Sequence, residues 1–587
     1  MNHATPLRAP LVLVCLLLIL AVLAIDGFAQ SGDRLATGQG NTDYGAAVAN
    51  LRELIADELQ RAIISGVSVA LVDDDRTILA EGFGMADEQR RVAANERTIY
   101  RVGSISKLFT ALAAMQLAEQ GKIDIDAPVR DILPDVSIHV PFEPIGPITL
   151  RQLMCHRSGM VRESPRGSYF DPTEPSSAET VASLAACALV NPPNTKTRYS
   201  NLGPTIVGET VARVAGTSFP EYQEKHVLGP LGMTQSAWLM NDRLHPHLAT
   251  GYMRVADGKG GFFRIAAPRF ELGTIGAGNL YSNVTDMARF AQMLLGRGRI
   301  AGRTIVRPET LDEMWTPQLT DEKNGFGLGF NVAQFAGHKT VQHMGAVYGF
   351  TSSLVVLPEA RIAVVVLCNE DVAKGPVIRI ANAALEQMLA AKLGKKPKDR
   401  PAPVSLDPEQ LASLVGDYES PSYWAEIRVI EGRIEANVSG QKFSLAPIGP
   451  LAFEGSGQAG HRVPVRFVRE GNRVVGFTAI DQTFTRVDEN SPREVPKQWL
   501  GYLGSYGPDF IPLIVSQRNG RLYAMTENVA DYRLTAVNRY VFKFPPGLYD
   551  DEFLVFHVDR DGKAHGVDLA NIPLSRNESS ATSNQHE

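Results

Sequence analysis

The sequence predicts an α/β chain of the α+β type, in which one domain of mixed helices and strands is followed by two small antiparallel β-barrel-like modules. Residues 45–392 alternate between helical and strand-like hydrophobic spacing. From about residue 405 the spacing changes to the period of two that is typical of half-buried strands. This second region also repeats itself at a nearly fixed offset, which indicates a duplicated structural unit.

Length and composition support a multidomain globular protein. A chain of 587 residues is too long for one hydrophobic core and suits about three domains. Hydrophobic residues make up 44% and charged residues 21%, which is ordinary globular usage. The net charge of −6, without any run of Lys and Arg, argues against nucleic acid as the main partner.

The N-terminus has the parts of a secretory signal peptide. Arg8 precedes an uninterrupted apolar run at 11–25, and a small-x-small sequence ends at Ala29. We therefore expect a signal peptide at 1–29 and a periplasmic or secreted mature protein without a stable membrane span. An uncleaved anchor is the alternative, but a spanning helix needs about 20 apolar residues and this run is shorter.

Cysteine usage does not indicate a metal site. After cleavage only Cys155, Cys187 and Cys368 remain, without metal-ligand or Cys-x-x-Cys spacing. We expect buried free thiols, and a single disulfide in an oxidising compartment stays open. The His-Pro-His sequence at 245–247 is a poor ligand set on its own, so we expect no metal and no cofactor. The oligomeric state cannot be predicted from these features.

The first domain is predicted at 30–394. Its helices are recognised by apolar residues at helical spacing and by end signals such as Gly216. In chain order the predicted elements are an amphipathic helix from Val48 to Ala62, strands at 66–72 and 77–83, helices at 108–120 and 202–214, strands at 326–330, 351–357 and 362–367, and a helix at 378–391.

Two β modules follow a charged, proline-rich linker at 395–404. The sequence Val-Gly-Asp-Tyr that ends at Tyr418 recurs as Leu-Gly-Ser-Tyr ending at Tyr506, and Phe-Thr-Arg ending at Arg486 recurs as Leu-Ser-Arg ending at Arg576. The offset stays between 88 and 90 residues. We therefore predict module 1 at 405–495, module 2 at 496–578, and a disordered tail at 579–587.

A serine nucleophile is suggested by Ser-Ile-Ser-Lys at 104–107, where a short apolar segment runs into a helix. Residues three apart share a helix face, so the Ser104 hydroxyl and the Lys107 amine can meet, whereas Ser106 points elsewhere. The same pattern occurs again at 439–442, in a β module, so the motif alone is not specific.

The chemistry sets requirements for this pair. A serine nucleophile needs a base within hydrogen-bond reach and donors for the developing oxyanion. Lys107 is a base only when neutral, so its pKa must fall by about three units, which corresponds to about 4 kcal/mol. Burial or a neighbouring cation can lower it. If Ser104 starts the helix, its free backbone N–H is one oxyanion donor.

Two further elements could complete the site. Tyr-Ser-Asn at 199–201 offers a phenol and an amide on one short loop, whereas its second copy, at 281–283, leads directly into a helix and is expected to cap it. His-Met-Gly-Ala at 343–346 lies beside a strand-like run, where a strand edge could hold substrate and present the Ala346 N–H as a second oxyanion donor. The alternative for His343 is a surface or core histidine near a turn.

Taken in order, Ser-x-x-Lys, Tyr-x-Asn and His-x-Gly resemble the family of class C β-lactamases, serine D-alanyl-D-alanine carboxypeptidases, D-stereospecific aminopeptidases and related esterases. The resemblance covers about residues 45–392 and implies a β-lactamase/transpeptidase-like catalytic domain, with a central antiparallel sheet flanked by helices. Further stretches that look like the family are Leu-Met-Cys-His-Arg-Ser-Gly-Met at 153–160, Gly-Pro-Leu-Gly-Met at 229–233, Gly-Asn-Leu-Tyr-Ser at 278–282 and Gly-Leu-Gly-Phe at 327–330.

The resemblance also implies roles for the site residues. Ser104 would form an acyl-enzyme that water hydrolyses. Lys107 and Tyr199 would share the duties of general base and acid, and which of them deprotonates Ser104 stays open. Asn201, together with the strand element of His343, Gly345 and Ala346, would bind substrate, and the N–H groups of Ser104 and Ala346 would form the oxyanion hole. His156 would have a supporting role.

Departures from the family pattern bear on the substrate. His343 and Met344 stand where many β-lactamases have Lys and Thr, so a fixed cation for a β-lactam carboxylate is weaker here. Arg157 replaces the commoner threonine. Asn194 stands where a turn glycine is usual, and asparagine tolerates that left-handed conformation.

The resulting expectation is an exported serine hydrolase that cleaves a small peptide or related amide. An esterase of the same family is one alternative, and a penicillin-binding sensor or scaffold with little turnover is another. D-aminopeptidases of this family also carry two C-terminal barrels, although such modules could instead dock a partner or the cell wall. The loop at 163–179 could border the pocket.

Overall fold

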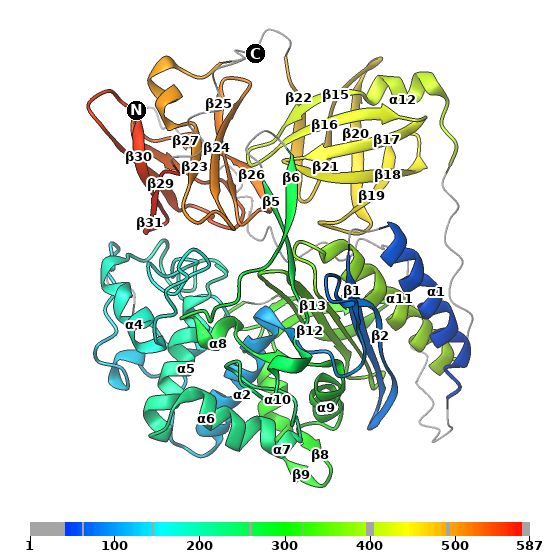
Figure 1. Ribbon diagram of the computed structural model, residues 1–587, viewed down its shortest axis with the longest axis vertical. Helices are drawn as coiled ribbons and strands as arrows, with labels where there is room; N and C mark the ends of the chain where they lie inside the picture. The colour runs from blue at the N-terminus through cyan, green and yellow to red at the C-terminus, as the bar shows by residue number, and fades with distance from the viewer. Residues whose placement is uncertain are drawn as a thin grey trace, which may run out of the picture.

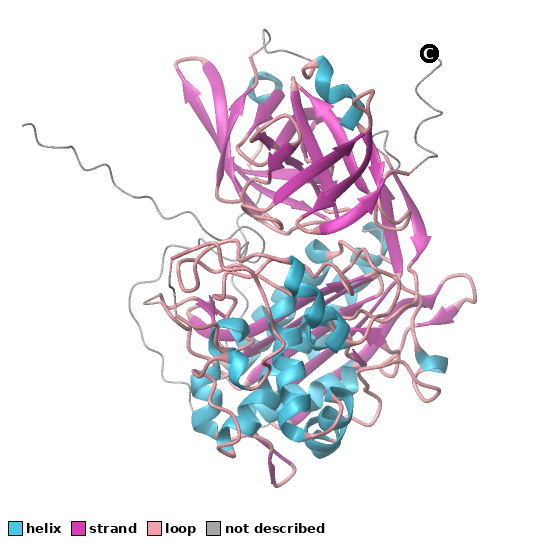
Figure 2. Cartoon of the chain, turned by 90° about the vertical axis from the view of Figure 1, so that its left-hand side faces the viewer, coloured by secondary structure: helices cyan, strands magenta, loops and turns pink. Residues whose placement is uncertain are grey.

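The computed structural model describes residues 42–61, 64–143, 146–256, 261–320, 322–394, 404–488 and 494–577. The predicted signal peptide and tail, and the predicted linker apart from Val404, lie outside these residues. Figures 1 and 2 show a body of helices and strands below a layer made almost entirely of strands. Within the described ranges, every helix is too short or too polar to cross a membrane.

An antiparallel sheet of eight strands forms the centre of the predicted catalytic domain, in the order β10-β11-β12-β13-β14-β1-β2-β3. Strand β1 pairs with β14, which comes about 300 residues later in the chain, and Val67 lies opposite Cys368. The strands are β1 (Gly66–Asp73), β2 (Arg76–Asp87), β3 (Val92–Ala93), β10 (Gly325–Phe326), β11 (Asn331–Phe335), β12 (His338–Val347), β13 (Phe350–Leu357) and β14 (Ile362–Cys368).

Helices cover both faces of this sheet, which explains why β1, β13 and β14 are buried along their whole length. Along β14, Val364 and Val366 pack into the cluster formed with α1 (Gly45–Arg61) and α11 (Lys374–Lys392). The alternate residues of that strand, Ala363, Val365 and Leu367, pack into the larger cluster on the opposite face. Because side chains alternate along a strand, the sheet has one hydrophobic core on each of its two faces.

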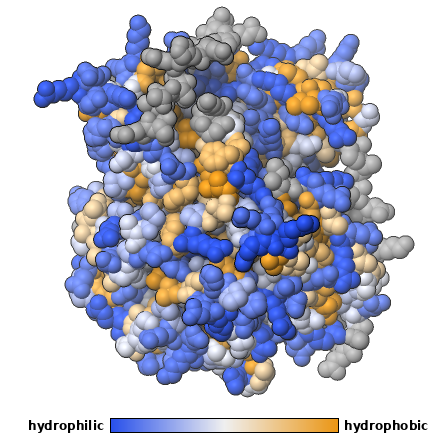
Figure 3. Space-filling view, viewed as in Figure 1, coloured by the Kyte–Doolittle hydropathy of each residue, from blue (hydrophilic) through white to orange (hydrophobic). Residues whose placement is uncertain are grey.

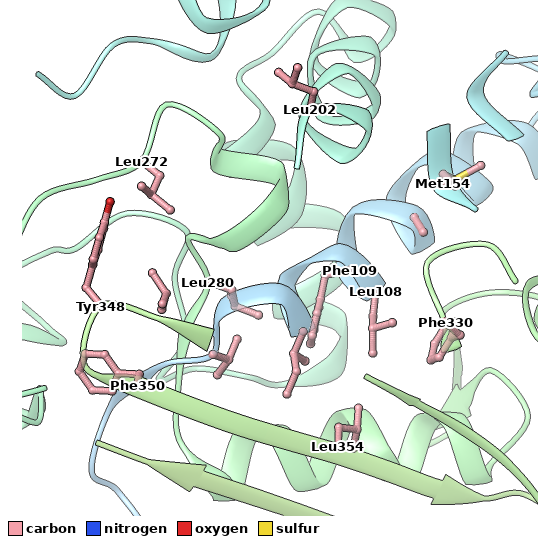
Figure 4. Close-up of a cluster of buried hydrophobic side chains, with 14 of the residues drawn as sticks. Leu108, Phe109, Met154, Leu202, Leu272, Leu280, Phe330, Tyr348, Phe350 and Leu354 are labelled. Carbon is pink, nitrogen blue, oxygen red and sulfur yellow. The ribbon is translucent and has the colours of Figure 1, made fainter. Parts of the chain in front are cut away.

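Helix α2 (Ser106–Glu119) is the central helix of the larger cluster. Its residues are buried from Ser106 to Leu117, as expected for a helix that is apolar on all sides. Figure 4 shows Leu108 and Phe109 directed from this helix toward the strand that carries Leu354. The ring of Phe109 stacks on Phe290 with centroids 4.1 Å apart. This packing fixes the start of α2 relative to the sheet.

The remaining elements of the catalytic domain are short. One predicted strand, at 326–330, is mostly wrong: pairing stops at Phe326 because Gly327 donates its N–H to the Phe330 carbonyl and closes a turn. The elements are β4 (Tyr100–Arg101), η1 (Gly103–Ile105), η2 (Val129–Asp131), α3 (Leu150–Met154), α4 (Ser177–Ala182), η3 (Ser183–Ala186), α5 (Leu202–Ala215), α6 (Phe219–Gln223), η4 (Glu224–Leu228), α7 (Gly229–Leu231), η5 (His245–His247), β5 (Tyr252–Ala256), β6 (Phe262–Ala266), α8 (Ile275–Gly278), β7 (Tyr281–Ser282), α9 (Val284–Leu295), β8 (Arg299–Ile300), β9 (Arg303–Thr304) and α10 (Pro308–Met314).

Module 1 is a closed barrel of eight strands. Tyr418 ties its first strand to the preceding helix by donating from its hydroxyl to the Leu414 carbonyl at 2.7 Å. Arg486 closes the seam by donating to the Val415 carbonyl and to the Tyr418 hydroxyl, both at 2.7 Å. Its elements are α12 (Pro408–Leu414), β15 (Gly416–Glu419), β16 (Trp424–Ile430), β17 (Arg433–Val438), β18 (Gln441–Gly449), β19 (Ala452–Gly457), β20 (Val463–Glu470), β21 (Arg473–Ala479) and β22 (Gln482–Arg486).

Module 2 has the same strand order but is divided into a four-stranded and a five-stranded sheet, which meet at an isolated bridge between Tyr506 and Arg576. The Tyr506 hydroxyl donates to the Tyr502 carbonyl at 2.6 Å, which repeats the Tyr418 contact of module 1. Its elements are η6 (Lys497–Tyr502), β23 (Gly504–Tyr506), β24 (Leu513–Arg518), β25 (Arg521–Thr526), β26 (Ala530–Arg533), β27 (Thr535–Ala536), β28 (Val541–Lys543), β29 (Phe553–Val558), β30 (Ala564–Leu569) and β31 (Ile572–Ser575).

The three described cysteines are buried free thiols, as expected. Burial raises the pKa of Cys155 and of Cys187 to about 12. A thiol in such an environment is a poor nucleophile and a poor metal ligand, because both roles need the thiolate.

The modules contact the catalytic domain at several points. The hairpin of β5 and β6 rises toward both modules in Figure 1, and Arg254 on β5 donates to the Gln458 side chain of module 1 at 3.0 Å. Module 2 contacts the loop that carries Arg162 and the segment that carries Lys196 and Arg198. Hydrophilic residues cover most of the face drawn in Figure 3, where exposed apolar residues form small groups.

Candidate active site

Ser104 lies in the short 3-10 turn η1, just before α2. The sequence predicts this helix at 108–120 and leaves a start at Ser104 open, whereas α2 begins at Ser106. The side chains of Ser104 and Lys107 nevertheless meet. Ser106 faces away from Lys107, because its hydroxyl donates to the Gly103 carbonyl at 2.6 Å and accepts the Leu280 N–H at 3.1 Å. Ser106 therefore fixes the turn that presents Ser104.

Lys107 is buried, with 2% of its surface exposed. Its Nζ donates to the Asn201 Oδ1 at 2.8 Å and to the Ala277 carbonyl at 2.9 Å. It also lies 2.9 Å from the Ser104 Oγ, whose hydroxyl can donate to the lone pair of a neutral amine. Burial is the main reason that the pKa of Lys107 lies well below its ordinary value, and a negative charge on Glu163 would oppose this shift. Desolvation therefore favours the neutral amine that the chemistry requires beside Ser104.

Tyr199 completes the immediate surroundings of the serine. Its phenol hydrogen-bonds Ser104, and its ring lies 5.0 Å from the Lys107 Nζ, measured to the ring centroid. Burial raises the pKa of Tyr199 above its ordinary value, while the Ser104 contact opposes the rise. The same desolvation therefore favours a neutral phenol and a neutral amine.

His156 supports the Tyr199 loop from beneath. The two rings stack with centroids 4.3 Å apart, and the His156 Nδ1 accepts the Ser200 N–H at 3.3 Å. Asn194 adopts a φ of 63°, the left-handed conformation expected for an asparagine in place of a turn glycine. Its N–H donates to the Arg157 carbonyl at 2.8 Å.

Asn201 joins the lysine to a buried acid. Its Oδ1 accepts from Lys107, and its Nδ2 donates to the Glu163 Oε1. Both ends of the amide therefore contact protein groups. The expected role of Asn201 in holding a substrate amide stays a prediction, whereas its contacts here position Lys107.

The strand β12 passes directly over the turn of Ser104. Residues 343–347 pair with β13 on one side, while β11 pairs only as far as Gln342, so their other edge faces the site. A side chain on Gly345 would lie 2.0 Å from the Val102 carbonyl oxygen, and one on Gly103 would lie 2.8 Å from the Ala346 nitrogen. Both glycines allow close approach of strand and turn, which brings Ala346 beside Ser104. Its oxyanion role stays a prediction.

His343 is buried and neutral. Its Nδ1 lies 2.5 Å from the Met344 carbonyl, which can only accept, so Nδ1 carries the proton. Burial lowers the pKa of His343 to about 3. Its Nε2 is therefore an acceptor, and among the described residues it has no hydrogen-bond partner. His343 supplies no fixed cation to this site.

Three groups that motif reasoning did not assign border the same site. Glu163 is fully buried, and burial raises its pKa to about 8. Arg162 lies 3.7 Å from Glu163 and pairs with Glu527 of module 2 at 3.1 Å. Tyr169 donates from its hydroxyl to the Ala346 carbonyl at 2.6 Å. The loop 163–179 was expected to border the pocket, but no signal in the sequence pointed to Glu527.

The two duplicate motifs have other roles. Asn283 caps α9, because its side chain accepts the Asp286 N–H at 2.8 Å, as predicted for the second Tyr-Ser-Asn copy. Ser439 lies in the turn between β17 and β18 of module 1 with a φ of 48°, and its hydroxyl accepts the Trp424 N–H at 3.2 Å. Position in the fold separates Ser104 from this second serine.

Comparison with known proteins agrees with this geometry. A family model described as Beta-lactamase matches residues 51–387, more than half of the chain. The chain therefore belongs to the β-lactamase family, which confirms the resemblance and the predicted fold class. Within the described ranges, His, Cys, Asp and Glu side chains form no group of three or more that could hold a metal ion.

Known proteins that are similar to this chain differ in the share of their own length that aligns with it. Penicillin-binding protein 4 of Amycolatopsis lactamdurans is 26% identical over 374 residues, which are 61% of this chain and 93% of that protein. The unguisins hydrolase of Aspergillus campestris is 25% identical over 338 residues, 54% of this chain and 60% of that protein. The octameric penicillin-binding protein homologue from Pyrococcus abyssi has a TM-score of 0.54 at 25% identity and covers 75% of this chain and 100% of its own.

Proposed function

We propose that the protein is an exported serine hydrolase that cleaves a peptide or related amide bond through an acyl-enzyme on Ser104. The observation that carries this proposal is the buried Lys107 amine, 2.9 Å from the Ser104 hydroxyl, in an environment that favours its neutral form. Membership of a family of serine hydrolases supports the reaction class.

The burial of both groups supports Lys107 as the base and Tyr199 as the acid. Burial lowers the pKa of Lys107 and raises that of Tyr199, so the free enzyme holds an amine that can accept a proton and a phenol that has one to give. Lys107 takes the hydroxyl proton as the Ser104 Oγ bonds to the carbonyl carbon. Tyr199 then donates its proton to the leaving nitrogen and is reprotonated from Lys107, and the carbon–nitrogen bond breaks.

Backbone groups would stabilise the intermediate. The N–H groups of Ser104 and Ala346 are the two donors for the oxyanion, because β12 lies against the turn of Ser104. Water then attacks the ester carbonyl, Lys107 or Tyr199 accepts its proton, and the acid product leaves with Ser104 restored. All of these groups belong to the catalytic domain.

The neutral His343 bears on the substrate. An unprotonated Nε2 accepts a hydrogen bond and repels a carboxylate, so it favours a substrate that presents an N–H or O–H group to β12. This supports peptide, amide or ester substrates over β-lactams with their carboxylate. The similarity to a penicillin-binding protein favours one second candidate, a protein that is acylated and turns over slowly.

Labelling with a fluorophosphonate tests the nucleophile. The wild-type protein should gain one adduct on the peptide that contains Ser104, measured by mass spectrometry. S104A should lose it, while S439A, which removes the serine of the duplicate motif, should keep it. An adduct that persists in S104A contradicts the assignment.

A substrate panel separates the activities. D-amino-acid amides, short peptides and p-nitrophenyl esters should be tested with wild-type protein and S104A. Turnover of amides or peptides supports the proposal, turnover of esters alone favours the esterase, and stable adduct without turnover favours the slowly deacylating protein. Fractionation of the native host tests export. If the signal peptide is cleaved as expected, N-terminal sequencing should find a mature chain that begins after Ala29.

A further inference from the structure

The Glu527 carboxylate of module 2 lies at the end of a continuous chain of contacts that reaches the catalytic serine. Glu527 binds the Arg162 guanidinium through two oxygens, each at 3.1 Å. The Tyr549 hydroxyl, also of module 2, donates to Glu527 at 2.9 Å. Both partners of the ion pair are largely buried, with 11% and 9% of their side chains exposed. A two-point contact between buried charges has a fixed geometry.

The chain continues through the catalytic domain. Arg162 lies 3.7 Å from the Glu163 Oε1. That same oxygen accepts from Asn201, whose other end accepts from Lys107, and the Lys107 amine contacts Ser104. One guanidinium is thus shared by two buried carboxyls, of which the one closer to Lys107 belongs to the catalytic domain.

We propose that Glu527 is a positioning residue for the catalytic amine: by binding Arg162 from module 2, it keeps Glu163 protonated and thereby keeps Lys107 in its basic form. This inference rests on the proposed function. It makes module 2 a part of the catalytic apparatus, although none of its atoms is needed for the chemical steps themselves.

The reason is competition for one cation. While Glu527 occupies both forks of Arg162, Glu163 has no strong partner for a negative charge, and its Oε2 has no hydrogen-bond partner among the described groups. Burial raises the pKa of Glu163 to about 8; the charge of Arg162 opposes this rise, and the charge of Glu527 adds to it. If Glu527 lost its charge, Arg162 would pair with Glu163, and a carboxylate one amide away from Lys107 would favour the ammonium form.

Other charged groups near the chain do not replace this pair. Lys107 is influenced by Glu163 and Arg162, and burial keeps the nearby imidazoles of His156 and His343 neutral. Around the pair of Glu527 and Arg162, the other titratable groups with a resolved interaction are carboxyls and phenols, namely Glu163, Asp371, Glu552, Tyr169, Tyr199, Tyr348, Tyr532 and Tyr549.

The rate of Ser104 acylation by a fluorophosphonate, measured from about pH 5 to about pH 9 on the full chain, tests the proposal. In E527Q the midpoint of the acidic limb should move up by about one pH unit, and the rate at neutral pH should fall about tenfold. The control is D551N, which removes an ion pair with Lys196 at the same interface and should keep the wild-type midpoint.

Each outcome has one meaning. If wild-type protein is not labelled at Ser104, the proposed function fails. If it is labelled but E527Q has the wild-type midpoint, or D551N shifts it equally, the role of Glu527 is overturned. If E527Q does not fold, E527D decides: its shorter side chain cannot keep both contacts to Arg162, so acylation should slow at least about threefold, and an unchanged rate overturns the proposal.

Discussion

The two β modules arose from the same repeat and relate differently to the active site. In module 1, the turn after β17 carries Ser439, a small residue bonded within its own barrel and to Asp531 of module 2. In module 2, the turn after β25 carries Glu527, which is 88 positions later and contacts Arg162 of the catalytic domain. One position in a repeated scaffold thus makes contacts only within the β modules in one copy and reaches Arg162, beside the candidate active site, in the other.

The two modules also differ in how completely their strands close into a barrel. Module 1 is hydrogen-bonded all the way round, whereas module 2 is divided between β26 and β27. Its polar loop residues Asp550, Asp551 and Glu552 bind Lys196 and Arg198 of the catalytic domain. Both modules thus keep the same tyrosine and arginine pair, Tyr418 with Arg486 and Tyr506 with Arg576. Their loops, in contrast, contact different parts of the protein.

The largest effect should come from the ion pair that links module 2 to the site. R162M leaves Glu163 and Glu527 buried without their shared cation, so we expect the free energy of unfolding to fall by about 3–5 kcal/mol. The matched change in module 1, R462M, removes a half-exposed pair with Glu454 and should cost less than about 1 kcal/mol. Urea unfolding of both variants measures the difference, and equal losses would contradict it.

A smaller effect should separate the equivalent tyrosines. Y418F removes a hydroxyl that contacts Leu414 and Arg486, each at 2.7 Å, whereas in Y506F the arginine contact is 3.4 Å long. We expect Y418F to lower the free energy of unfolding by about 2 kcal/mol and Y506F by about 1 kcal/mol. Thermal unfolding should show the larger loss of stability in Y418F. A larger loss in Y506F would mean that module 2 depends more on its tyrosine contacts than module 1 does.

The smallest effect concerns the contact between the modules. Trp424 of module 1 donates to the Asp531 carboxyl of module 2 at 2.9 Å, and burial raises the pKa of Asp531 to about 6. Because the folded pKa lies above the unfolded one, this group's contribution to stability is full below about pH 4 and is lost as the pH rises to about 6. D531N should remove this part of the loss of stability between about pH 4 and about pH 6. An unchanged pH profile of unfolding would show that the carboxyl is already ionised.

Much of this arrangement could be predicted because it is local. Residue spacing predicted the Ser104–Lys107 contact, and the position of Asn283 directly before a helix predicted its capping role. The left-handed Asn194 was expected from the family resemblance, because it stands where a turn glycine is usual. Family resemblance brought the Tyr199 and His343 elements to the same site. These features depend on short sequence patterns that report backbone geometry directly.

The rest depends on contacts between distant segments. Glu163 follows no motif, and its protonation is set by burial and by Arg162, neither of which can be read from neighbouring residues. Glu527 lies 365 positions from its partner in a turn whose repeat equivalent is a serine. The predicted strand at 326–330 failed because a glycine turn overrides an apolar run that otherwise has strand spacing.

The pairing of β1 with β14 has a consequence for how the chain matures. Val67 cannot meet Cys368 until about 300 further residues have been synthesised, so the central sheet is a long-range structure of the kind that forms slowly. The strands of each module pair mostly with their immediate neighbours and can assemble as they emerge. The lysine stays hydrated, and hence charged, until the sheet closes. The desolvation that lowers the pKa of Lys107 is therefore complete only once both ends of this domain have been synthesised.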